Sequence, residues 1–142
     1  MLAFDFGTRK IGVAVGNTVV RVAHPLTTIR GEAGVPRFAA IGALLAEWQP
    51  RALIVGLPVH ADGTPHAVTA QAEQFAQALE VRYGLPVMRV DERYTTAVAD
   101  ADLRAAGVRG TARAQARDAA AAQLILQSWF DDDRGNATRD PA

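Results

Sequence analysis

Acidic side chains stand at three separate places in the chain where carboxylates could act together. Asp5 lies inside an apolar stretch, Asp91 and Glu92 follow another, and Asp118 begins an amphipathic one. An ionised carboxylate among apolar neighbours loses much of its hydration, and a bound metal ion is one cation that compensates this loss. Converging carboxylates also repel one another, and a divalent metal held by oxygen ligands relieves the repulsion. These acids therefore indicate a candidate metal site.

Asp5 and Asp118 each have a purely structural interpretation as well. Asp5 is followed by Gly7 and Thr8, and an aspartate beside a glycine turn often accepts hydrogen bonds from that turn. Asp118 at the start of a helix would act as an N-cap or be stabilised by the helix dipole. The metal-site hypothesis depends on whether the acids converge, and this depends on the elements that position them.

The composition describes one ordinary domain without an overall charge. The chain has 142 residues, 49% of them hydrophobic, and fifteen basic side chains balance fifteen acidic ones. One hydrophobic core is therefore expected, and any site for a polyanion must be local. The absence of cysteine excludes disulfides and thiolate metal sites. A strand that begins at Leu2 leaves no room for a signal peptide, and no apolar stretch approaches the roughly 18 residues of a membrane helix. We expect a cytoplasmic protein without membrane contact.

The spacing of apolar residues predicts the secondary structure around the acids. Strands are expected over residues 2–6, 11–15, 19–29, 52–57 and 87–91, and helices over 35–48, 65–83, 95–106 and 118–130. Thr64 would cap the second helix, and Gly84 would end it. The order predicts an α/β domain over residues 1–130, with a five-stranded mixed sheet of three antiparallel and then two parallel strands, and helices on both faces. Residues 131–142 are expected to form a flexible tail.

This topology predicts where the acids meet. Open sheets of this type bind ligands at the carboxyl ends of their parallel strands, where residues 56–64 and 91–96 form loops. Asp5, on the neighbouring first strand, would face the same crevice. Asp118 shares one face of its helix with apolar residues and therefore points toward the sheet. Acids from three segments are thus expected at one edge.

Four motifs, in order, resemble those of the YqgF (RuvX) family. They are Asp5-Phe6-Gly7-Thr8 with Ile11-Gly12-Val13-Ala14, Gly56-Leu57-Pro58 with Asp62-Gly63-Thr64, Asp91-Glu92-Arg93 with Thr95-Thr96, and Asp118 before Ala119-Ala120 and Ile125-Leu126. The resemblance covers roughly the whole chain to Phe130. It implies a ribonuclease H-like fold, a relation to the Holliday junction resolvase RuvC, and a nuclease that processes pre-16S rRNA.

The resemblance also implies a chemistry for the acids. Two Mg²⁺ or Mn²⁺ ions about 4 Å apart would support an in-line water and the leaving oxygen of a phosphodiester. Asp5 would bridge the two ions, with Asp118 on one side and Glu92 or Asp91 on the other. Neighbouring residues of a strand point to opposite faces, so one of these two acids is the expected ligand, and the longer reach favours Glu92. The remaining acid would pair with Arg93.

Substrate contacts are expected from backbone amides and from basic side chains. The full set is Gly7, Thr8, Lys10, Gly63, Thr64, Arg93, Arg109, Arg113 and Arg117. Gly63 and Thr64 would offer free amides at a helix N-terminus to a phosphate. Residues 103–117, the basic segment, hold four arginines and no acid, and either guide a nucleic-acid backbone or form a solvated loop. The family often has a lysine where this chain has Ala116, so Arg113 or Arg117 would have to supply that charge.

Other functions use the same residues. A Holliday junction resolvase or a single-strand DNA nuclease would need the same acids. The Asp5-Phe6-Gly7-Thr8 turn also resembles the phosphate-binding turn of actin-like ATPases, but those proteins need two such domains and this chain has room for one. A non-catalytic nucleic-acid binding module is disfavoured, because carboxylates without metal repel phosphates. We expect RNA rather than DNA as the substrate, in a pre-ribosomal particle, and a monomer or a homodimer.

Overall fold

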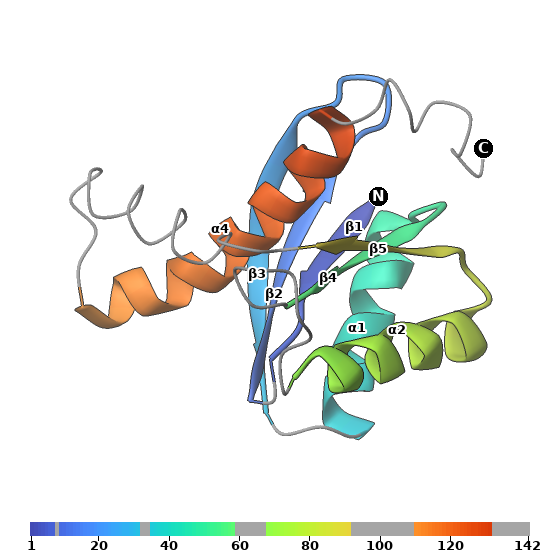
Figure 1. Ribbon diagram of the computed structural model, residues 1–142, viewed down its shortest axis with the longest axis horizontal. Coiled ribbons are helices and arrows are strands. Elements are labelled where there is room, and N and C mark those ends of the chain that lie inside the picture. Colours follow the sequence, from blue (N-terminus) through green and yellow to red (C-terminus); the bar gives the residue numbers. More distant parts are fainter. Residues whose placement is uncertain (8, 32–34, 59–67, 92–109, 132–142) are drawn as a thin grey trace.

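In the computed structural model the described residues are 1–7, 9–31, 35–58, 68–91 and 110–131. Over these ranges the chain forms β1 (Leu2–Asp5), β2 (Lys10–Gly16), β3 (Ala23–Arg30), α1 (Val35–Trp48), β4 (Leu53–Leu57), α2 (Thr69–Tyr83), β5 (Val87–Asp91) and α4 (Gly110–Asp131). Figure 1 shows the sheet between α4 on one side and α1 with α2 on the other. The prediction of helices on both faces is confirmed.

The sheet has the predicted mixture of strand directions. Its order is β3-β2-β1-β4-β5. The pairs β1–β2 and β2–β3 are antiparallel, whereas β1–β4 and β4–β5 are parallel. Because β1 and β4 are parallel neighbours in the sheet, their carboxyl ends lie side by side. The residue that ends β1 is Asp5.

Strand alternation divides the interior into two cores. Leu2 and Phe4 of β1 pack beneath α1 and α2, where the rings of Phe4 and Phe75 meet edge to face with centroids 5.9 Å apart. Ala3 packs on the opposite face, beneath α4, together with Ala14 of β2. Successive strand residues point to opposite faces, so Asp5 shares the face of Ala3, which α4 covers.

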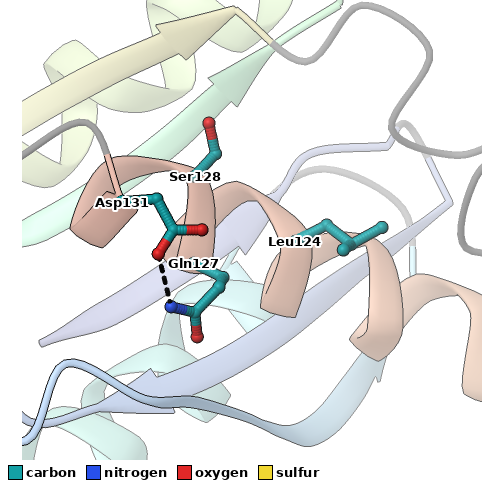
Figure 2. A pocket seen from close by; sticks show the side chains of 4 residues that line it. All are labelled: Leu124, Gln127, Ser128 and Asp131. Carbon is teal, nitrogen blue, oxygen red and sulfur yellow. Dashed lines mark hydrogen bonds between the residues drawn. The ribbon is translucent and has the colours of Figure 1, made fainter.

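Two glutamines join the far part of α4 to the start of β3. The amide of Ala23 donates a hydrogen bond of 2.9 Å to Oε1 of Gln127, and Nε2 of Gln123 donates one of 3.0 Å to the carbonyl of Ala23. Gln127 also donates to the carboxylate of Asp131, at 3.0 Å. Figure 2 shows this last bond beside Ser128, at a surface pocket on the outer side of α4. The two bonds with Ala23 hold α4 against the start of β3.

Several element boundaries differ from the prediction. β3 begins at Ala23 rather than at residue 19, because Oδ1 of Asn17 accepts hydrogen bonds from the amides of Val19 and Val20 and turns the chain there. α2 ends at Gly84, as predicted, with a left-handed φ of 67° at that residue. It begins at Thr69 rather than at residue 65, so the predicted start was too early.

The last helix is longer than predicted. α4 begins at Gly110, so Asp118 lies in its third turn and is neither an N-cap nor a first-turn residue. Residues 111–117 are rich in alanine, arginine and glutamine, which are strong helix formers. The predicted tail over 131–142 begins one residue too early, because Asp131 ends α4. The rest of that tail, the predicted helix over 95–106 and the Thr64 cap lie outside the described residues. No helix in the described part of the chain is long and apolar enough to cross a membrane.

Candidate active site

Asp5 ends β1 between two glycines. In the strand register it is opposite Gly12 of β2 on one side and Gly56 of β4 on the other. Cross-strand neighbours without side chains leave the carboxylate room on both sides. Asp5 is half-buried and makes at least one polar or ionic contact with the rest of the chain. The carboxyl end of β1 therefore has space for the Asp5 carboxylate and for a ligand bound to it.

Gly12 brings the last helix to this edge. A Cβ atom placed on Gly12 would overlap the carbonyl group of Asp118 and would stand 3.0 Å from the amide nitrogen of Ala119. The backbone of α4 at Asp118 thus lies directly on Gly12, which is the register partner of Asp5. Two of the predicted acids, from opposite ends of the chain, are brought to the same place in the sheet by one glycine.

Asp118 is nearly buried, and its charge is balanced by Lys10 of β2. The Nζ atom of Lys10 lies 3.0 Å from Oδ2 of Asp118, and the two side chains are 32% and 13% exposed. Oδ2 has no hydrogen bond of good geometry with any described residue, so its contact with Lys10 is an ion pair. Sequence reasoning gave Lys10 a role in substrate binding and missed its contact with Asp118, which joins residues far apart in the chain.

The chemistry of these groups fits a divalent cation. A buried carboxylate oxygen that lacks a directed donor retains lone pairs for a metal, and oxygen ligands suit Mg²⁺ and Mn²⁺. The ranges that the structure describes contain no cluster of three or more acidic, histidine or cysteine side chains. Glu92, the expected third acid, lies outside those ranges. Asp91 ends β5 in register with Leu57, one position beyond the level of Asp5.

Of the predicted substrate-binding residues, the structure places Gly7 and Lys10 close to the two acids. A Cβ atom on Gly7 would stand 2.5 Å from the carbonyl oxygen of Lys10, so the turn after β1 is too tight for a side chain there. The backbone of Arg113 and Arg117 belongs to α4, so the predicted loop is wrong at these positions. The remaining predicted residues lie outside the described ranges, namely Thr8, Gly63, Thr64, Arg93 and Arg109.

Comparison with known proteins identifies the family. A family model described as RuvX, Holliday junction resolvase, matches residues 1–132. The chain belongs to the RuvX family. Among similar RuvX relatives, one from Dechloromonas aromatica is 55% identical over 131 residues, covering 92% of this chain and 90% of the relative. One from Burkholderia lata is 54% identical, covering 92% and 88%. Both bear the name "Putative pre-16S rRNA nuclease".

Solved structures confirm the fold. RuvC of Thermus thermophilus, in complex with a Holliday junction substrate, superposes with a TM-score of 0.53 at 18% identity, covering 95% of this chain and 97% of that one. A second T. thermophilus RuvC structure gives a TM-score of 0.51 at the same identity and the same coverage. The RuvX chain therefore has the predicted ribonuclease H-like fold, with its mixed five-stranded sheet.

Proposed function

We propose that this RuvX protein is a metal-dependent nuclease that hydrolyses phosphodiester bonds in a precursor of 16S rRNA, in the cytoplasm. One observation carries the proposal, which is that Gly12 contacts the backbone of Asp118 and pairs with Asp5. Two acids predicted from separate motifs therefore meet at the carboxyl end of the sheet, where α/β proteins bind ligands. RNA as the substrate is supported by the names of relatives that match 92% of the chain.

Glu92 is the third acid of the proposal. Met88 and Val90 of β5 pack against the core beneath α4, whereas Arg89 bonds to Glu73 and Glu80 of α2 on the opposite face. If the extended conformation of β5 continued, two-residue alternation would put position 92 on the α4 side and position 91 on the α2 side. Alternation therefore favours Glu92 over Asp91 as the companion of Asp5 and Asp118.

Each group has a distinct task in the proposed reaction. Two Mg²⁺ or Mn²⁺ ions, when bound, supply an activated water and charge stabilisation for the leaving oxygen. Asp5, Glu92 and Asp118 hold these ions through carboxylate oxygens. The arginines of the basic segment bind backbone phosphates of the RNA and orient it. These backbone contacts do not select a sequence.

A second candidate function is cleavage of a four-way DNA junction, which the description of the matching family model favours. Both functions use the same acids and metal, so the substrate decides between them. The assay presents three labelled substrates to the purified protein: a pre-16S RNA fragment, single-stranded DNA of the same sequence and a four-way junction. Preferred cleavage of the RNA supports the proposal, and preferred cleavage of the junction supports the resolvase function.

The metal requirement is tested in the same assay. Cleavage should stop in excess chelator and return with Mg²⁺ or Mn²⁺, whereas Zn²⁺ should substitute poorly because it prefers nitrogen and sulfur ligands. The Asp118→Asn variant, purified in the same way, controls for contaminating nucleases and should be inactive throughout. Full cleavage in excess chelator, with the variant inactive, would refute a metal mechanism. Cleavage by the variant would instead point to contamination.

A further inference from the structure

Lys10 is the only lysine in the chain, and its ammonium group lies on the carboxylate of Asp118. We infer that Lys10 is a counter-ion that competes with the metal: it neutralises Asp118 in the metal-free protein and is displaced when a divalent ion binds. The inference rests on the proposed metal site. Lys10 would then regulate metal binding at Asp118, whereas the sequence predicted that it contacts the substrate.

The competition follows from the oxygen that both cations need. Oδ2 of Asp118 is buried, and 3.0 Å separates it from Nζ of Lys10. A magnesium ion binds carboxylate oxygen at about 2 Å and repels a neighbouring ammonium group, so the lysine cannot keep its place beside the same atom. The metal-free carboxylate, in turn, needs a positive partner because an unpaired buried charge is costly.

The structure indicates which of the two partners moves. The backbone of Asp118 is held against Gly12, where no space remains for even a methyl group. Lys10 is 32% exposed and has a flexible four-carbon side chain, so it can turn to solvent without a change in the backbone. Metal binding should therefore release the lysine and leave the aspartate in place.

The single lysine makes this displacement directly observable. Reductive methylation with ¹³C-formaldehyde labels the ε-amine of Lys10 and the terminal amine of Met1, which have different chemical shifts in an NMR spectrum. Titration with Mg²⁺ should move the Lys10 signal, with a midpoint equal to the dissociation constant that calorimetry gives for Mg²⁺ with the same labelled protein. The Asp118→Asn variant should show neither the metal-dependent movement nor the binding heat of this site.

Variants test the direction of the coupling by calorimetry. Lys10→Met should bind Mg²⁺ more tightly, by about fivefold, because the worth of a partly exposed ion pair no longer opposes binding. Lys10→Arg keeps the charge and should bind within about twofold of the wild type. Arg30→Met is the matched control, since it removes a charge on the adjacent strand without touching Asp118, and it too should stay near the wild type.

Three results would overturn the inference. If Mg²⁺ binds but the Lys10 signal does not move, the metal site stands and the displacement is wrong. If Lys10→Met binds Mg²⁺ more weakly, the lysine positions Asp118 for the metal and does not compete with it. If calorimetry shows no Mg²⁺ binding by the unmodified wild type, the proposed metal site fails, and the inference fails with it.

Discussion

Replacing Gly12 with alanine should separate the two acids. The added methyl group would overlap the carbonyl of Asp118 and stand 3.0 Å from the amide nitrogen of Ala119, and both are backbone groups that cannot rotate away. Ordinary contact between such atoms needs about 3.5 Å, so this part of α4 must withdraw from β2 by at least about 1 Å. The withdrawal moves Asp118 away from the strand position of Asp5.

The structural cost of this change can be estimated. Overpacking of a tight interior typically costs about 1–3 kcal/mol, and a backbone partner places Gly12→Ala near 3 kcal/mol. For a chain of 142 residues this corresponds to a fall of about 10 °C in melting temperature. A misplacement of about 1 Å at a catalytic group lowers the rate by about 100-fold. We therefore expect low stability and slow RNA cleavage together.

Gly42→Ala is the matched control for this experiment. Gly42 lies inside α1, where an added Cβ would be 3.6 Å from Oη of Tyr83, an ordinary contact. Alanine is the better helix former by about 1 kcal/mol, so this variant should melt slightly higher and cleave normally. Scanning calorimetry and cleavage well below both melting temperatures separate the effects. A Gly12→Ala protein that melts low but cleaves at the wild-type rate would refute the idea that Gly12 brings the acids together.

Three further perturbations test other parts of the molecule. Asp5→Asn should abolish cleavage and leave the metal-free protein at least as stable as the wild type, because it removes a charge beside Asp118. A lower melting temperature would mean that Asp5 stabilises the turn after β1 through hydrogen bonds. Replacing the arginines at 109, 113 and 117 should flatten the salt dependence of RNA binding by about one log–log unit for each lost contact, and an unchanged slope would exclude these arginines as contacts. Arg89→Met should cost about 1 kcal/mol at neutral pH. The hydrogen bond from Arg89 holds the pKa of Glu80 below its ordinary value. The stabilisation is therefore present above about pH 4.5 and is lost as acid protonates Glu80. If the melting temperatures of Arg89→Met and the wild type still differ in acid, the stabilisation does not come from the Arg89–Glu80 pair.

The sheet could be predicted from the sequence because local patterns determine it. The continuous apolar stretch of β4 indicated a strand covered on both faces, and this strand pairs in parallel with β1 and β5. The glycine and the proline after α2 marked its end. Asp5 and Asp118 each interrupt an apolar pattern, and the predicted topology placed their segments together; the structure has both segments at Gly12, and the role of the two acids stays a prediction.

The start of α4 and the partner of Asp118 could not be predicted in the same way. Asp118 resembled an N-cap because aspartate is favoured there, and residues 110–117 have no apolar stripe that would reveal a helix. Figure 1 shows that this first part of α4 extends beyond the sheet, and the helix propensity of its residues favours a helix there. The contact of Lys10 with Asp118 depends on where α4 crosses β2. That position cannot be predicted from the sequence pattern of either element alone.

The packing of α4 on the first strands also determines when the protein can become active during its synthesis. β1 and β2 leave the ribosome early, but Asp118 and the two glutamines that bind Ala23 are made about 100 residues later. At about 5–20 residues per second, this delay lasts roughly 5–20 s. During it the α4 side of the sheet has no cover and the carboxylates have not met. If these acids form the active site of an RNA nuclease, as proposed, a nascent chain should not cut RNA, including that of the ribosome that makes it, until its last helix has docked.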